Sequence, residues 1–88
     1  MKLKNRKVII TGAAQGMGGT ITRTLAREGA DLFLTARTRG PLEELAEELT
    51  TEGVKVDLQE GDATKEAEVI KVVDAAKTFF TGRIDVLV

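Results

Sequence analysis

The chain has 88 residues, of which 42% are hydrophobic, and its 13 Lys and Arg residues nearly balance its 14 Asp and Glu residues, giving a formal net charge of −1. This composition is typical of a globular protein and argues against a disordered tail or a binder of nucleic acid or membrane surfaces. The sequence contains no Cys, His, Tyr, Trp or Ser. Most covalent and acid–base catalysis by these residues alone is therefore excluded, as are disulfides and zinc fingers.

The first half of the chain alternates apolar runs with amphipathic segments. The β-branched run Lys7–Thr11 (KVIIT) predicts a buried strand that ends at a glycine. A helix is predicted over Gly16–Glu28, because apolar residues recur at every fourth position until another glycine follows. The run Ala30–Ala36 (ADLFLTA) predicts a second strand. The expected buried face of the helix consists of Met17, Ile21 and Leu25.

The second half repeats this alternation. A helix is predicted after Pro41, a residue suited to a first helical turn, and is expected to end near Gly53. Residues 54–59 (VKVDLQ) alternate in polarity and predict a strand at a sheet edge. Another helix follows, with Thr64 as the candidate N-cap, and residues 83–88 (RIDVLV) predict a last strand. The expected apolar face of that helix consists of Val69, Val72, Val73, Ala76 and Phe80.

The order β-α-β-α-β-α-β predicts an α/β fold, a doubly wound parallel sheet with right-handed crossovers and strand order 3-2-1-4. In that order the first two helices cover one face of the sheet and the third covers the other. The last strand becomes an edge without a guarding charge or proline. We expect this edge to be completed by residues beyond Val88, by another chain or by self-association. Its exposed apolar residues are expected to be Ile84, Val86, Leu87 and Val88.

A glycine-rich turn, TGAAQGMG, joins the first strand to the first helix. Gly12 lets the chain turn off the strand, and Gly16 and Gly18 let the helix start approach a pyrophosphate without an intervening Cβ. Free backbone N–H groups and the positive end of the helix dipole supply an anion site. The alternative is a plain strand-to-helix connector, but strand, turn and helix stand in the order that favours the phosphate site.

Four segments of the chain resemble the short-chain dehydrogenase/reductase family. Residues 11–18 (TGAAQGMG) and 25–30 (LAREGA) are similar to its N-terminal signature. Residues 61–64 (GDAT) resemble its aspartate-containing loop after the third strand, and residues 83–88 resemble its fourth strand. The resemblance covers nearly all of the chain. It implies a Rossmann-like fold and an NAD(P)-dependent oxidoreductase that transfers hydride between the nicotinamide and a carbonyl or alcohol substrate.

The resemblance also implies roles for single residues. The three glycines of the turn match the family's pyrophosphate-binding glycines, and the residues between them line the phosphates and ribose. Asp62 matches the aspartate that receives the adenine amino group, and Ala63 lies beside the ring. The alternative for Asp62 is a loop or capping carboxylate. The implied cofactor-binding residues are Gly12, Ala14, Gln15, Gly16, Met17, Gly18, Asp62 and Ala63.

The end of the second strand indicates which dinucleotide is preferred. Sites that prefer NAD carry Asp or Glu there to accept from the ribose 2′-OH. This chain has Ala36, followed by Arg37 and Arg39, with no carboxylate until Glu43. Because an Arg fork can meet a 2′-phosphate at two points, the sequence predicts NADP over NAD, with Arg37 as the main contact and Arg39 as a second. The alternative is that both arginines are solvated loop charges.

The family's catalytic Ser, Tyr-x-x-x-Lys pair and Asn match no position of this chain. Residues 1–88 are therefore expected to be a partial NAD(P)-binding domain, the N-terminal half of a short-chain dehydrogenase, inactive alone. The alternatives are a non-catalytic nucleotide-binding or self-associating half-Rossmann module, and a structural remnant without binding activity. The expected partners are the dinucleotide and either a homo-oligomer or missing C-terminal residues, with no nucleic acid and no membrane. No apolar run is long enough for a membrane span or signal peptide, so a cytoplasmic location is expected.

Overall fold

The computed structural model describes residues 3–14 and 16–88, which form four strands and three helices in strict alternation. Strand β1 matches its predicted bounds, and the other elements start or end within a few residues of prediction. The final strand is shorter than expected, because residues 83–85 form the loop that enters it. The elements are β1 (Lys7–Thr11), α1 (Gly16–Arg27), β2 (Asp31–Thr35), α2 (Arg39–Thr51), β3 (Val56–Leu58), α3 (Glu66–Phe79) and β4 (Val86–Leu87).

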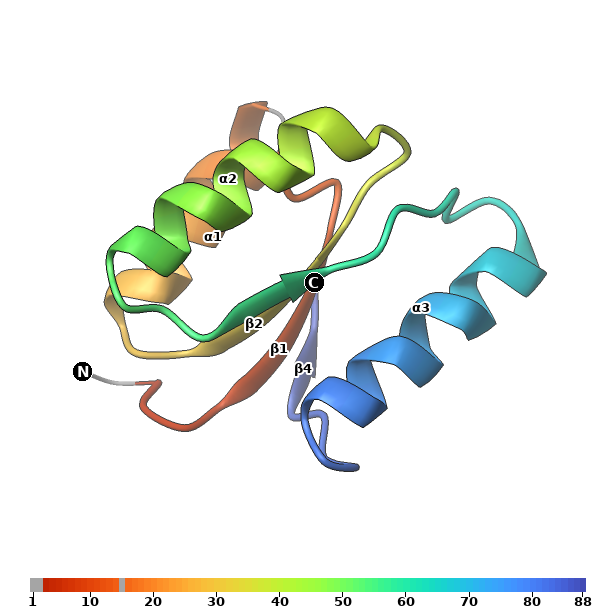
Figure 1. The fold of residues 1–88 in the computed structure, drawn as a ribbon. Coiled ribbons are helices and arrows are strands. Elements are labelled where there is room, and N and C mark those ends of the chain that lie inside the picture. Colours follow the sequence, from red (N-terminus) through yellow and green to blue (C-terminus); the bar gives the residue numbers. More distant parts are fainter. Residues whose placement is uncertain (1–2, 15) are drawn as a thin grey trace.

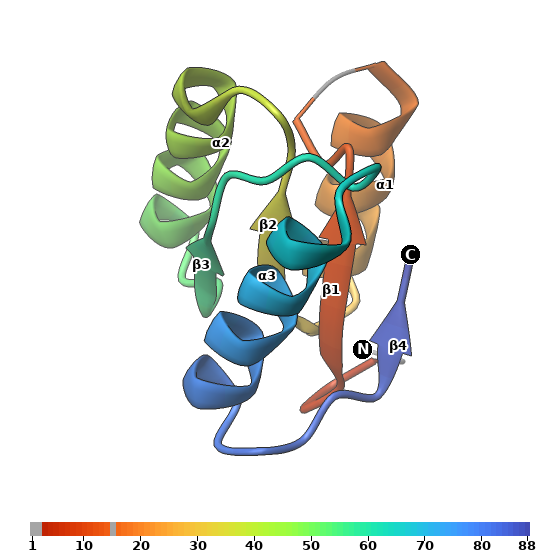
Figure 2. The ribbon, with the colours of Figure 1, turned by 90° about the vertical axis from the view of Figure 1, so that its right-hand side faces the viewer.

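The strands form one parallel sheet in the order β3-β2-β1-β4, which confirms the predicted doubly wound α/β fold. Helices α1 and α2 cover one face and α3 covers the other, so the sheet lies between two helical layers (Figure 1). Strands β1 and β2 pair along their whole length, from Lys7 with Asp31 to Thr11 with Thr35. The turns that follow β1, β2 and β3 consequently meet at one end of the sheet, at the top of Figure 2.

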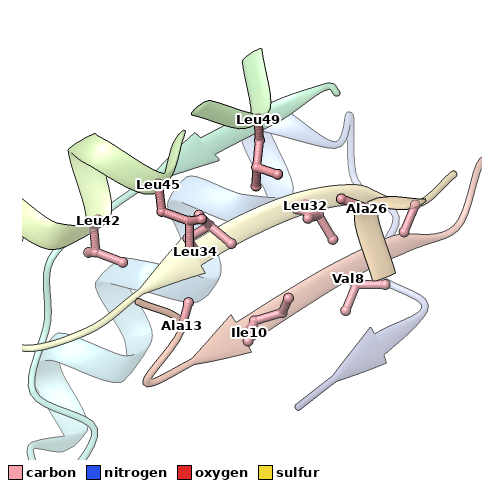
Figure 3. Close-up of a cluster of buried hydrophobic side chains, with 10 residues drawn as sticks. Val8, Ile10, Ala13, Ala26, Leu32, Leu34, Leu42, Leu45 and Leu49 are labelled. Atoms are coloured by element: carbon pink, nitrogen blue, oxygen red, sulfur yellow. The ribbon is translucent and has the colours of Figure 1, made fainter. Parts of the chain in front are cut away.

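Alternate side chains of β1 and β2 pack into two separate hydrophobic cores, one on each face of the sheet. Val8 and Leu32 point towards α1 and α2, where they pack with the leucines of α2 (Figure 3). Ile9 and Phe33 point to the opposite face and pack with Phe80 after α3. The period-two alternation of a doubly covered strand explains why both strands read as continuous apolar runs. The larger core comprises Val8, Ile10, Ala13, Ala26, Ala30, Leu32, Leu34, Leu42, Leu45 and Leu49.

The predicted buried face of α1 is wrong. Met17 is 80% exposed and Ile21 is 37% exposed, while Leu25 is only partly buried. Small residues face the sheet instead, and they allow the start of α1 to lie close against the turn that precedes it. The buried residues of α1 are Gly19, Thr22 and Ala26.

Two helix starts also differ from prediction. Helix α2 begins at Arg39, before Pro41, and its N-cap is Thr38. The N-cap of α3 is Lys65 rather than Thr64, because the hydroxyl of Thr64 donates to the carboxylate of Asp62 instead. Val72 and Ala76 on α3 and its C-cap Phe80 are buried as predicted, whereas Val69 is exposed and Val73 half-buried.

Strand β4 forms an exposed edge of the sheet, as predicted. Val86, Leu87 and Val88 all keep a large exposed fraction. Ile84 differs from the prediction, since it packs against the core beneath α3. Within residues 3–14 and 16–88, no helix has the length and hydrophobicity needed to cross a membrane.

Candidate functional site

A cavity of about 640 Å³ opens at the end of the sheet where the turns after β1, β2 and β3 meet. Ligands of open α/β sheets bind at this carboxyl edge, and the volume lies within the range of small-molecule sites. The cavity therefore has the position and size of a ligand site. Its lining residues are Thr11, Gly12, Thr35, Ala36, Arg37, Thr38, Gly61, Asp62, Ala63 and Thr64.

The glycines of the β1–α1 turn are required by the backbone. Gly12 has φ +59° and Gly16 has φ +49°, in the left-handed region that favours glycine. Gly18 has a different constraint, because a Cβ on it would lie 1.9 Å from the carbonyl oxygen of Gly12. The absence of a side chain at Gly18 thus allows the first turn of α1 to touch the end of β1.

A buried threonine fixes this turn to the helix. The Thr22 hydroxyl lies 3.0 Å from the carbonyl oxygen of Ala13 and 2.7 Å from that of Gly18. The N–H of Ala13 donates to the carbonyl of Thr35 at 3.3 Å, which links the turn to β2. The first turn of α1 contains no acidic residue, so its positive end is available to an anion.

The two predicted arginines occupy different environments. Arg37 lines the cavity, and its Nε lies 3.9 Å from Oδ2 of Asp62, although 78% of its side chain is exposed. Arg39 lies in the first turn of α2 and donates to Glu43 at 2.7 Å. Only Arg37 faces the cavity with its charge available to a ligand.

Asp62 is held in a fixed loop conformation. Its Oδ1 accepts hydrogen bonds from the N–H of Thr64 at 2.9 Å and from the Thr64 hydroxyl at 2.6 Å. Its own N–H donates to Oε1 of Glu68 at 2.8 Å, and its carbonyl accepts from the N–H of Lys65 at 3.0 Å. Oδ2 therefore remains on the side of the carboxylate that faces Arg37.

These hydrogen bonds shift the titration of Asp62. The side-chain and backbone donors of Thr64 lower the pKa of Asp62, with smaller contributions from the positive charges of Arg37 and Lys65, while burial acts in the opposite direction. The pKa of Asp62 in the folded protein lies below the ordinary pKa of an aspartate. The ionised carboxylate therefore stabilises the fold at any pH above that ordinary pKa. Its contribution is lost as the pH falls through the lowered pKa.

We expect Thr64→Val to raise the pKa of Asp62, because the substitution removes the hydroxyl donor and keeps the backbone donor. An NMR titration of the Asp62 carboxyl carbon measures the shift. Thr38→Val is the matched control, since Thr38 also lines the cavity and makes no side-chain cap bond at its helix. An unchanged pKa in Thr64→Val would contradict the assigned cause.

The predicted site residues fall into two groups around one end of the sheet. One group lines the cavity and the other forms the turn and the first turn of α1, where Met17 is exposed. Gln15 lies outside the described residues. The cavity group is Gly12, Arg37, Asp62 and Ala63, and the helix group is Ala14, Gly16, Met17 and Gly18.

Sequence reasoning missed three polar residues at this end of the sheet. Thr22 and Glu68 hold the two loops by hydrogen bonds. Thr35 lines the cavity with a buried hydroxyl that has no hydrogen-bond partner within the described part of the chain. The register that places Thr35 beside Thr11 is set by the pairing of β1 with β2, and nothing in the sequence marks the contacts of Thr22 and Glu68.

Residues 6–88 match the family model of short chain dehydrogenases. Glycine betaine reductase ATRR of Emericella nidulans is 41% identical over 86 residues, which cover 98% of this chain and 7% of that protein. Oxidoreductase UcpA of Escherichia coli is 40% identical over 87 residues, which cover 99% of this chain and 32% of that protein. The chain thus spans a third or less of the length of either relative.

Solved structures extend the similarity to the fold. An alcohol dehydrogenase from the archaeon Thermococcus sibiricus, complexed with 5-hydroxy-NADP, superimposes with a TM-score of 0.90 at 38% identity, over 96% of this chain and 36% of that one. A short chain dehydrogenase/reductase from Burkholderia phymatum, in complex with NAD, gives a TM-score of 0.92 at 28% identity, over 99% of this chain and 31% of that one.

Proposed function

This chain belongs to the short-chain dehydrogenase family, and on that premise we propose that it binds the adenine and 2′-phosphate end of NADP(H) as part of an oxidoreductase. The whole protein would transfer hydride between the nicotinamide and a carbonyl or alcohol substrate. Residues 1–88 would be the N-terminal portion of its NAD(P)-binding domain. The position of Arg37 on the wall of the cavity carries this proposal.

The described residues fit a dinucleotide in two places. The positive end of α1 suits the pyrophosphate, since Gly12 and Gly18 keep the backbone there free of side chains and no acidic residue occupies the first turn. The cavity suits adenosine, since Ala63 offers an apolar contact for the ring. Oδ2 of Asp62, which has a loose ionic contact with Arg37 at 3.9 Å, offers an acceptor for the adenine amino group. Ala14, Gln15, Gly16 and Met17 would line the phosphates and ribose, as the family resemblance implies.

The choice of NADP over NAD depends on charge at the end of β2. Ala36 and Arg37 line the cavity where a carboxylate would favour an unphosphorylated ribose. Arg37 has only a loose ionic contact, 3.9 Å from Asp62, so its guanidinium can turn to a phosphate at little cost. Solved relatives carry either NAD or an NADP derivative, so membership of the family alone does not favour one.

In the proposed reaction, the cofactor carries the hydride and the residues of this chain bind the cofactor. When bound, the nicotinamide supplies or accepts the hydride. The residues described above bind and orient the adenine end, and none of them is assigned a proton transfer, because the chain contains no Ser, Tyr or His. The proposal also includes a cytoplasmic location and either a homo-oligomer or completion of the β4 edge by C-terminal residues, as the sequence and the family resemblance lead us to expect.

Calorimetric titration of the full-length protein with NADPH and with NADH tests the proposal. We expect NADPH to bind about tenfold more tightly or better, which corresponds to about 1.4 kcal/mol. The preference should weaken as salt is raised, because it rests on an exposed charge. Equal affinities would overturn the NADP assignment, and binding of neither nucleotide would overturn the function.

A non-catalytic nucleotide-binding or self-associating module is the second candidate. The lack of catalytic side chains in these residues favours it, since binding needs only the turn and the cavity. Oxidation of NADPH by the full-length protein with a panel of carbonyl substrates separates the two functions. Turnover supports the oxidoreductase, whereas binding without turnover supports the module.

A further inference from the structure

Glu68 makes an unusual contact at the start of α3. It is the third residue after the N-cap Lys65, a position whose Glu commonly reaches back to the N–H of the N-cap residue itself. Here its Oε1 accepts at 2.8 Å from the N–H of Asp62, which lies six residues before Glu68 and three before the N-cap. The carboxylate therefore holds the site loop rather than the end of the helix.

Glu68 contacts the backbone of Asp62 and not its carboxylate. It is absent from the lining of the large cavity and lines an adjoining cavity of about 220 Å³, which shares Thr11, Thr35, Gly61, Asp62 and Ala63 with the large one. Its other oxygen lies 3.8 Å from Nζ of Lys65, and 39% of its side chain is exposed. Glu68 can thus affect a ligand in the large cavity only through the loop it holds.

Asp62 is consequently fixed by two residues with separate tasks. Thr64 occupies Oδ1, and Glu68 fixes the peptide from which the side chain projects. The loop is also held by the N–H of Gly61, which donates to the carbonyl of Ala36 at 2.9 Å, and by the N–H of Lys65, which donates to the carbonyl of Asp62 at 3.0 Å. Neither of these bonds satisfies the N–H of Asp62, which donates to Glu68. Removal of the Glu68 acceptor would free the peptide N–H of Asp62 and allow Oδ2 to leave its direction towards the cavity.

We propose that Glu68 is a positioning residue that aims the Asp62 carboxylate at the adenine amino group and so sets the selectivity for adenine over other purines. This inference rests on the proposed function. The selectivity arises because adenine places an amino donor at position 6 of the purine, opposite Oδ2 of Asp62, whereas a base with a carbonyl at position 6 places an acceptor there. The N1–H donor of such a base lies at the neighbouring ring position and points in a different direction.

The test compares NADPH with its hypoxanthine analogue, in which a carbonyl oxygen replaces the adenine amino group. Calorimetry on the full-length wild type should show about tenfold tighter binding of NADPH, as expected for a hydrogen bond to a charged acceptor. In Glu68→Ala this ratio should fall to about two, with the loss confined to NADPH. Glu68→Gln, which keeps an acceptor oxygen, should restore most of the ratio.

Glu66→Ala is the matched control, because Glu66 lies in the same first turn of α3 and makes no side-chain hydrogen bond or ion pair with the described residues. It removes the same charge from the helix start and should leave the ratio unchanged. Circular dichroism checks folding, and Glu68→Met, of similar length and without an acceptor oxygen, replaces Glu68→Ala if that variant unfolds.

The outcomes separate the inference from the function on which it rests. A wild type that binds neither nucleotide overturns the proposed function. The role of Glu68 alone is overturned if the wild type binds NADPH more tightly than the hypoxanthine analogue and the folded Glu68→Ala or Glu68→Met variant shows the same ratio of affinities. An equal loss of affinity for both nucleotides also overturns it, since that result indicates general damage to the loop.

Discussion

Replacing Gly18 by alanine is expected to lower the free energy of unfolding by about 3 kcal/mol and to abolish dinucleotide binding. The new Cβ would lie 1.9 Å from the carbonyl oxygen of Gly12 and 2.9 Å from its carbonyl carbon. Both are backbone atoms, so no rotamer change can relieve the overlap. Either α1 moves away from β1 or the turn changes shape, and each displaces the proposed phosphate site.

Gly19→Ala is the matched control, one residue further along the same helix. Its Cβ would approach the flexible end of Arg23 at 3.4 Å and backbone oxygens at no less than 3.7 Å. This variant should be as stable as the wild type or more stable by up to about 1 kcal/mol, because alanine favours helix over glycine. Urea unfolding followed by circular dichroism measures both variants, and equal stabilities would contradict the Gly18–Gly12 contact.

Arg37→Asp is expected to weaken NADPH binding by about 100-fold, which corresponds to about 2.7 kcal/mol. The substitution removes the proposed charge-assisted hydrogen bonds to the 2′-phosphate and puts a carboxylate in their place, which repels the phosphate and can accept from a ribose hydroxyl. NADH should therefore bind as well as before or better, and the preference between the nucleotides should invert. Calorimetric titration of both nucleotides measures the two affinities.

Arg39→Asp provides the comparison for charge alone. Arg39 is two residues further on, pairs with Glu43 at 2.7 Å and does not line the cavity. Its replacement changes the net charge by the same amount and should alter NADPH affinity by no more than a few fold, as expected for a distant, screened charge. If both variants lost affinity equally, the long-range field of the protein rather than contact by Arg37 would explain the preference.

Much of the fold could be predicted because strands and helices have characteristic patterns of apolar residues in the sequence. The run Lys7–Thr11 and the glycine after it gave the bounds of β1, and the alternation of elements gave the order β3-β2-β1-β4. The face of α1 could not be predicted from hydropathy. The buried side of α1 consists of Gly19, Thr22 and Ala26, and the hydroxyl of Thr22 bonds to the turn while Met17 is exposed. Contact with the turn rather than hydropathy therefore determines which face is buried.

The candidate site also contains residues that could be predicted from the sequence and residues that could not. Motif residues such as Gly12 and Asp62 could be placed from spacing and resemblance, and the cavity contains both. The contacts of Thr22 and Glu68 could not, since each depends on where a loop comes to rest against a helix. Arg39 could not be separated from Arg37 either, because that required the start of α2, where an i,i+4 ion pair with Glu43 forms.

The buried contact between Thr22 and the carbonyl of Ala13 makes the glycine turn part of a cooperative folding unit. Ala13 and Thr22 are both fully buried, and the turn bonds in addition to Thr35 of β2. Breaking the contact between Ala13 and Thr22 therefore requires α1 to separate from the turn, so the amide of Ala13, which donates to Thr35, should exchange with solvent at a rate set by subglobal unfolding rather than by loop motion. The exposed glycine amides on either side of it should exchange much faster, so slow exchange within this turn would mark the buried contact alone.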